Sequence, residues 1–210
     1  QNFIKKRPKT KIVCTIGPSS SEVKILKKMI SEGMSVARLN LSHGTIDEHK
    51  KYVSNAREAA KELSVPIGIL IDIPGPKYRV GKIPGGSIDL KKGQKIIIGK
   101  ETNLNEKVIK LKVWPEGISK EVGKSKQIFL DDGFLKLSID SKKGKNILCT
   151  VLNDANLKSN KSVTIPGSVN KLDYFTNETK SGLNFAKKVN STFVGLSFIR
   201  NSDDIKRVKK

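Results

Sequence analysis

The feature that most constrains the fold is a change of hydrophobic pattern after about residue 75. Before it, apolar runs that predict buried parallel strands alternate with amphipathic stretches that predict helices. After it, short stretches of alternating polarity are separated by glycine and asparagine, which is typical of a small β-barrel or sandwich. The α/β alternation resumes near residue 165. We therefore expect an α/β domain of residues 1–75 and 165–210, interrupted by an all-β domain of residues 76–164.

The individual elements follow from local signals. In the α/β part, strands are expected at residues 11–17, 35–41, 67–72 and 192–198, and helices after Ser19–Ser21, at 46–63, at 176–189 and from 202. In the all-β part, strands are expected at 87–90, 95–98, 108–111, 127–130, 135–139 and 147–151. Gly33 suits the end of the first helix, and Thr176 suits an N-cap.

Composition excludes some classes of protein. The 210 residues carry a net charge of +21, but the charge is spread as lysine along the chain, and aromatic residues make up only 5%. That pattern indicates a solvated surface with a local anion site, and we expect no specific nucleic-acid partner. No apolar run approaches the ~20 residues of a membrane span, and no signal sequence is evident. Cys14 and Cys149 lack metal-type spacing, so a cytoplasmic protein is expected.

Polar groups of different kinds end the second expected strand. Arg38 offers a planar fork that suits phosphate or carboxylate. Asn40 and Ser42 follow at spacings of two, so all three side chains point to one face, and His43 and Gly44 come next. In parallel α/β folds, sites are built at the C-terminal ends of strands. The alternative is that these polar side chains only form hydrogen bonds within the turn that follows the strand, without a ligand.

Six motifs in order carry a family resemblance. They are Lys11–Pro18, Arg38–Gly44, Leu70–Arg79, Phe129–Gly133, Lys161–Gly167 and Ser197–Arg200. Together they closely resemble the N-terminal half of pyruvate kinase, with the first strands of its barrel and its inserted β domain. The resemblance implies a partial (β/α)8 barrel of about four β/α units, whereas a complete barrel has eight.

The resemblance also implies an activity and roles for particular residues. Pyruvate kinase transfers a phosphoryl group from phosphoenolpyruvate to ADP in glycolysis, giving pyruvate and ATP. By position, the arginines of the transferring phosphoryl group are Arg38 and Arg79, and the residues beside the phosphoenolpyruvate carboxylate are Ser197 and Phe198. The nucleotide residues are His43, Arg79, Lys161 and Asp131, the last in a lid over the nucleotide. For Arg38 the alternative is a structural ion pair with Asp72, and for Asp131 a simple hairpin turn.

Two cations belong to the family pattern. Asn40, Ser42 and Asp72 match the side-chain ligands of its monovalent cation, for which hard oxygen donors are suited. Many members carry a glutamate where this chain has Lys77, and Ile73–Pro74 replaces a Thr-Lys pair. An ammonium can supply the charge of K⁺, so we expect that K⁺ is not required. The family's catalytic lysine and Mg²⁺ ligands belong to later strands and are expected beyond residue 210.

Three functional readings remain open at this point. The first is a pyruvate kinase present as an N-terminal fragment that is inactive alone. The second is a non-catalytic relative that binds a nucleotide or phosphoanion, and the third is a basic nucleic-acid-binding protein. One observation separates the first two readings: whether the coding frame continues into a strand that contains Lys-x-Glu. Members of the family are commonly tetramers, so the resemblance implies a homo-oligomer for the complete protein.

Overall fold

The computed structural model describes residues 9–209. It forms two compact units, of which the second comprises Pro76–Asp173 and the first comprises the chain before and after it. The first boundary lies where the sequence places it. The second corrects the expected boundary at residue 165, because Ile165 and Leu172 pack in the core of the β domain. The Lys171 amide also donates to Glu121 of that domain.

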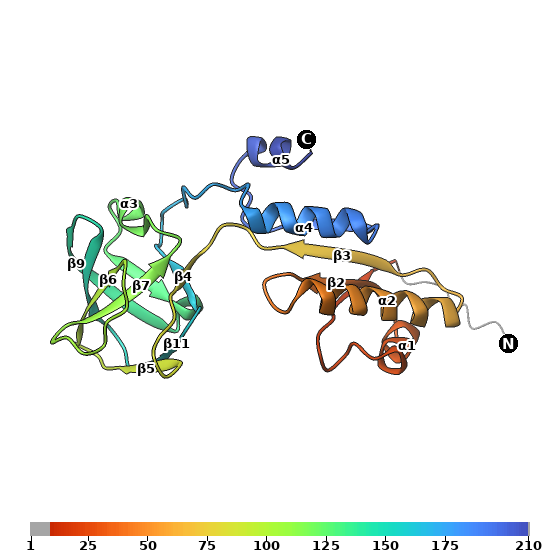
Figure 1. The fold of residues 1–210 in the computed structure, drawn as a ribbon, viewed down its shortest axis with the longest axis horizontal. Helices are drawn as coiled ribbons and strands as arrows, with labels where there is room; N and C mark the ends of the chain where they lie inside the picture. Colours follow the sequence, from red (N-terminus) through yellow and green to blue (C-terminus); the bar gives the residue numbers. More distant parts are fainter. Residues whose placement is uncertain (1–8, 210) are drawn as a thin grey trace. The chain divides into compact units, whose positions relative to one another are not determined.

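The first unit is a four-stranded parallel sheet with helices. Its elements are β1 (Ile12–Thr15), α1 (Val23–Ser31), β2 (Met34–Asn40), α2 (Ile46–Glu62), β3 (Gly68–Ile73), α4 (Asn177–Lys188), β13 (Phe193–Leu196) and α5 (Ser202–Lys209). The strand order is β1-β2-β3-β13, and every pairing is parallel. In Figure 1, α4 runs alongside β3. This α/β arrangement is the one predicted from the alternating pattern.

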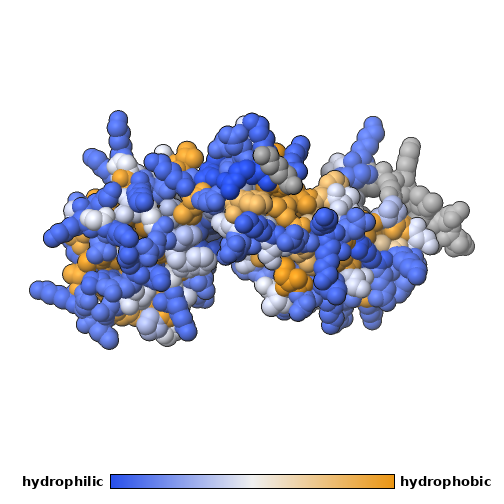
Figure 2. Space-filling model, turned by 45° about the horizontal axis from the view of Figure 1, so that its top comes forward, coloured by the Kyte–Doolittle hydropathy of each residue, from blue (hydrophilic) through white to orange (hydrophobic). Residues whose placement is uncertain are grey.

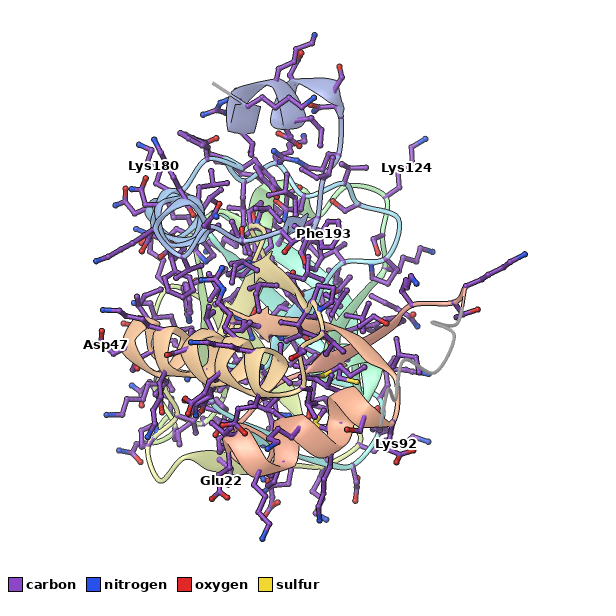
Figure 3. All side chains as sticks on the ribbon, turned by 90° about the vertical axis from the view of Figure 1, so that its right-hand side faces the viewer. Glu22, Asp47, Lys92, Lys124, Lys180 and Phe193 are labelled. Atoms are coloured by element: carbon purple, nitrogen blue, oxygen red, sulfur yellow. The ribbon has the colours of Figure 1, made fainter. Side chains whose placement is uncertain are left out.

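Alternation along the strands decides which side chains meet the helices. Ile69, Ile71 and Ile73 of β3 are buried in a core that also contains Phe185 of α4. The residues between them, including Asp72, point to the opposite face, because successive strand residues alternate. Charged side chains such as Asp47 and Lys180 project from the helices (Figure 3). The sheet therefore has one face packed on helices and one face that bears Asp72.

Helix starts show where local signals succeed and fail. Thr45 caps α2, and Glu48 closes a reciprocal capping box with it. The predicted cap Thr176 accepts a hydrogen bond from the Thr179 amide. The predicted serine cap of α1 is wrong, because α1 begins after Glu22 without a side-chain cap. Ser20 instead bonds to Gly17 in the preceding turn.

The second unit is a closed seven-stranded barrel with a small added ribbon. Its elements are β4 (Tyr78–Val80), β5 (Ser87–Leu90), β6 (Lys95–Gly99), β7 (Ile109–Trp114), α3 (Ile118–Glu121), β8 (Gln127–Leu130), η1 (Asp131–Gly133), β9 (Leu135–Lys143), β10 (Asn146–Val151), β11 (Ala155–Lys158) and β12 (Ser162–Thr164). The barrel order is β10-β6-β7-β4-β12-β8-β9, and β11 pairs with β5. Figure 1 shows β6, β7 and β9 curving around this barrel.

The six predicted strands of this domain are present, but β4, β11 and β12 were not predicted. β4 and β12 are only three residues long, and β11 contains a single large apolar residue, Leu157, so none of the three shows a clear alternation. Among residues 9–209, no helix combines the length and the apolar character needed to cross a membrane.

Candidate functional site

The arginine at the end of β2 is held in place on two sides. Arg38 Nε donates to Asp72 Oδ2 at 3.0 Å, and Nη2 donates to the same oxygen. Nη1 donates to Thr15 Oγ1 of β1 at 2.6 Å. These contacts exist because parallel register sets Thr15 beside Arg38 and joins β2 to β3. The guanidinium is therefore fixed at the C-terminal edge of the sheet, with its side chain 33% exposed.

The fixed arginine keeps free hydrogen-bonding capacity. A guanidinium carries five N–H donors, and these three hydrogen bonds use one on each of its three nitrogens. One N–H remains on each terminal nitrogen, and each can donate to an oxygen of a phosphate or carboxylate. The ion pair with Asp72, which was the structural alternative for Arg38, is thus present and still compatible with anion binding.

Asp72 joins three strands at this edge. Its second oxygen, Oδ1, accepts a hydrogen bond from Ser197 Oγ at 3.2 Å, just after β13. The predicted residues Arg38, Asp72 and Ser197 therefore form one hydrogen-bonded group. Thr15 belongs to the same group and was missed, although its place opposite Arg38 at the end of the first strand could have indicated it.

The predicted cation ligands lie beside this group. Asn40 stands directly opposite Asp72 in the pairing of β2 with β3. Asn40 Oδ1 accepts from the Ser42 amide at 3.0 Å, so these residues form the local turn that was the alternative for them. Amide, hydroxyl and carboxylate oxygens of this kind fit an alkali cation. Among residues 9–209 no group of three or more His, Cys, Asp or Glu residues is placed to hold a metal ion.

His43 and Phe198 are both at the surface of this unit. The His43 backbone oxygen accepts from the His49 ring, which orders the loop, while the His43 side chain is exposed. Phe198 is 52% exposed and has a φ of +61°. The turn at Ser197 and Phe198 approaches residue 75 so closely that only glycine fits, since a Cβ on Gly75 would lie 2.1 Å from the Ser197 backbone oxygen.

A second group lies at one end of the β domain. Lys161 Nζ pairs with Asp131 Oδ1 at 2.9 Å, and Lys77 Nζ pairs with Asp132 Oδ1 at 3.3 Å. Ser162 Oγ donates to Asp132 Oδ1 at 2.6 Å. That hydrogen bond, with a smaller contribution from the Lys77 charge, lowers the pKa of Asp132.

Arg79 belongs to the same part of the β domain. Its Nη1 donates to the Asn160 backbone oxygen at 3.0 Å. Arg79 also stands opposite Ser162 where β4 pairs with β12 in antiparallel orientation. The nucleotide residues predicted in this domain, Arg79, Lys161 and Asp131, are therefore neighbours. Asp132 and Ser162 extend the group and were not among the predicted site residues. Lys77, predicted to replace a cation, contacts Asp132 here, and its predicted role stays a prediction.

Comparison with known proteins shows the family of this chain. Residues 7–210 match the family described as "Pyruvate kinase, barrel domain". The chain is 37% identical over 202 residues to a pyruvate kinase of Thermococcus litoralis, covering 96% of this chain and 42% of that protein. It is 36% identical to a pyruvate kinase of Trypanoplasma borreli, with 95% and 41% covered.

A solved structure is also similar. The crystal structure of a pyruvate kinase from Cryptosporidium parvum superposes with a TM-score of 0.85 at 34% identity, covering 95% of this chain and 41% of that one. This likeness confirms the predicted partial (β/α)8 barrel with an inserted β-barrel. The chain spans about two fifths of the length of these relatives.

Proposed function

Because the chain belongs to the pyruvate kinase family, we propose that it supplies the first part of an enzyme that transfers a phosphoryl group from phosphoenolpyruvate to ADP. In this reaction the bond from phosphorus to the enol oxygen breaks, and a bond to the terminal phosphate oxygen of ADP forms. The products are ATP and, after protonation of the enolate, pyruvate. The relatives are named pyruvate kinase, and the substrates follow from that activity.

The observation that supports the proposal best is the Arg38 guanidinium, held by Asp72 and Thr15 with an N–H left on each terminal nitrogen. Phosphoryl transfer depends on positioning and on neutralising charge around the moving group. A fixed fork meets both needs, because it does not have to reorganise when the charge develops. In the proposal, Ser197 and Phe198 border the carboxylate of phosphoenolpyruvate.

The β-domain group is proposed to bind the nucleotide. Arg79 and Lys161 are the cations, and Asp131 orients Lys161 through their ion pair. His43 is the proposed nucleotide contact of the other unit. Closure of the β domain over the nucleotide, as in the family, would exclude water from the transfer.

Cations complete the proposed site. A divalent metal, which the family uses, neutralises phosphate charge when bound, and its ligands are proposed to lie outside the described residues. Asn40, Ser42 and Asp72 would hold a monovalent cation. We further propose that Lys77 makes K⁺ unnecessary, that the protein acts in the cytoplasm, and that the complete protein is a homo-oligomer.

The test compares two variants in a protein that joins this chain to the rest of a barrel. We expect Arg38→Lys to lower kcat by roughly 100-fold or more, because a point charge cannot reproduce a two-pronged contact with the transition state. His43→Ala should cost much less, since its side chain lies at the surface. Steady-state ATP formation measures both. Equal losses would remove Arg38 from the proposed role.

A further inference from the structure

A buried glutamate joins separate segments of the β domain. Glu121, the last residue of α3, is only 7% exposed. Its Oε1 accepts hydrogen bonds from the Tyr78 hydroxyl of β4 at 3.1 Å and from the Lys171 amide at 2.9 Å. Its Oε2 accepts a hydrogen bond from Ser168 Oγ at 3.3 Å. All three donors are neutral groups, and these hydrogen bonds offset the cost of removing the carboxylate from water.

The segments that Glu121 joins are the two connections of the β domain to the rest of the chain. The outgoing segment is residues 76–78, and the return segment is residues 168–172. Figure 1 shows the chain leaving the β domain past α3 on its way to α4. The two segments are also joined directly, because Asn170 Nδ2 donates to the Pro76 backbone oxygen. We call the pair of joined segments the strap.

The strap includes a neighbour of the proposed nucleotide residues. Tyr78 stands between Lys77 and Arg79 in the sequence, and its ring is buried in the barrel core. Burial and the charge of Glu121 raise the pKa of Tyr78, so its hydroxyl remains a hydrogen-bond donor. Successive strand side chains alternate, so fixing the Tyr78 ring inside the barrel also fixes the direction in which Arg79 leaves it.

We propose that Glu121 is a positioning residue of the phosphoryl transfer. It makes the return segment part of the β domain, so that closure over the nucleotide turns the chain only at residues 75–76 and 173–174. The inference rests on the proposed function, which assigns the closure but not the places where the chain turns. The compact unit that ends at Asp173, just beyond the strap, supports it. A released strap would add turning points, and the closed state would then cost more conformational entropy.

Amide hydrogen exchange in the 210-residue chain tests the strap itself. Glu121→Ala should make the Lys171 amide exchange about tenfold faster or more, because its acceptor is lost, while amides between β6 and β10 exchange as in the wild type. Glu121→Gln should keep the protection, since its amide oxygen accepts from Tyr78 and Lys171 and its NH2 group can donate to Ser168. Glu116→Ala is the matched control, because the Glu116 side chain is 58% exposed and pairs with surface lysines of the same domain.

Steady-state kinetics test the positioning role in a protein that joins this chain to the rest of a barrel. Glu121→Ala should raise KM for ADP and lower kcat, each by about three- to tenfold, because ADP binding and transfer both use the closed domain. KM for phosphoenolpyruvate should stay within about twofold, since its proposed contacts Arg38, Ser197 and Phe198 belong to the other unit. Glu121→Gln should restore both parameters, and Glu116→Ala should leave them unchanged.

The outcomes separate this inference from the function on which it rests. Unchanged exchange at Lys171 in Glu121→Ala would show that Glu121 does not hold the strap, and the inference is overturned. Faster exchange throughout β6 and β10, or faster exchange at Lys171 with unchanged KM for ADP and kcat, would make Glu121 a structural residue only, which also overturns it. Turnover by the wild-type protein leaves the proposed function standing in each of these cases. Without that turnover the proposed function and the positioning role both fail, and the exchange result alone decides whether Glu121 holds the strap.

Discussion

At the scale of single residues, the candidate site contains residues that could be predicted from the sequence and hydrogen-bond partners that were not predicted. Arg38, Asp72 and Ser197 could be predicted because each follows or ends an apolar run at a motif of the family. Thr15 was missed, because a threonine at the end of a strand has many possible roles, and only the register of β1 on β2, which sets it opposite Arg38, indicates this one. The pairing of Lys77 with Asp132 likewise depends on how β4 and the turn after β8 meet.

The Lys77 hypothesis gives a prediction at this scale. In a protein with the complete barrel, the rate should be nearly independent of K⁺, because the ammonium supplies the charge of the ion. Lys77→Glu should restore K⁺ activation, since the carboxylate removes that charge and leaves Asn40, Ser42 and Asp72 able to recruit the cation. Rate against K⁺ concentration, with Na⁺-free counterions, measures this. Lys82→Glu, a change at an exposed lysine of the same domain, is the matched control.

Two results would contradict the Lys77 hypothesis. One is a wild-type protein that K⁺ activates strongly. The other is equal K⁺ dependence of Lys77→Glu and Lys82→Glu, which would indicate that any lost lysine has the same effect.

At the scale of elements, the short strands and the loop contacts were the parts that the sequence pattern did not predict. The helices and the strands with clear apolar alternation were predictable from periodicity, whereas β4 and β12 have only three residues and β11 has one large apolar residue. The close approach of Gly75 to Ser197 was also beyond prediction, since these residues are distant in sequence. It requires a glycine because a Cβ at residue 75 would lie 2.8 Å from the Phe198 Cβ as well.

The contact at Gly75 predicts the effect of one added methyl group. Gly75→Ala should lower the free energy of unfolding by about 1–3 kcal/mol, as overpacking typically does, and should displace the Ser197–Phe198 turn. Gly17→Ala is the control in the same unit, because no atom lies within 4 Å of a Cβ there. Denaturant unfolding measures both. Equal stability of the two variants would show that the turn at residue 197 moves aside without cost.

The turn after β8 predicts a pH effect. The hydrogen bond from Ser162 lowers the pKa of Asp132 below its usual value of 3.8. A carboxyl whose pKa is lowered by folding stabilises the fold above its unfolded pKa, and this stabilisation is lost as the pH falls through the folded pKa. Asp132→Asn should therefore lose stability at neutral pH but show a weaker further loss on acidification below about pH 4. Unfolding curves from pH 7 to pH 2 test this, and parallel curves for both proteins would contradict it.

At the scale of the whole molecule, the sheet of the first unit carries an exposed apolar surface. Val13 and Phe193 are 50% and 53% exposed, and Val36 and Phe193 lie over Gly68 on the face away from the helices. Figure 2 shows hydrophobic patches within a mostly hydrophilic surface. In a complete (β/α)8 barrel this face is the interior, which further strands fill with packed side chains. The sequence indicated the count of four strand–helix units but not which side chains the open face would expose.

Activity should therefore depend on the remainder of a barrel. The 210-residue chain alone is expected to show no pyruvate kinase turnover above background, because the family resemblance implies that the catalytic lysine and the Mg²⁺ ligands belong to later strands, and charge neutralisation by the metal is central to the transfer. Metal-dependent ATP formation by the pure chain, from phosphoenolpyruvate and ADP, would contradict this expectation.

The most direct test of the account is a chimera. This chain would replace the matching 42% of the Thermococcus litoralis pyruvate kinase, and ATP formation from phosphoenolpyruvate and ADP would be measured with added Mg²⁺. The account predicts metal-dependent turnover in the chimera, and loss of that turnover when Arg38 becomes alanine. A folded chimera that binds both substrates but forms no ATP, or one whose rate is unchanged by Arg38→Ala, would contradict it.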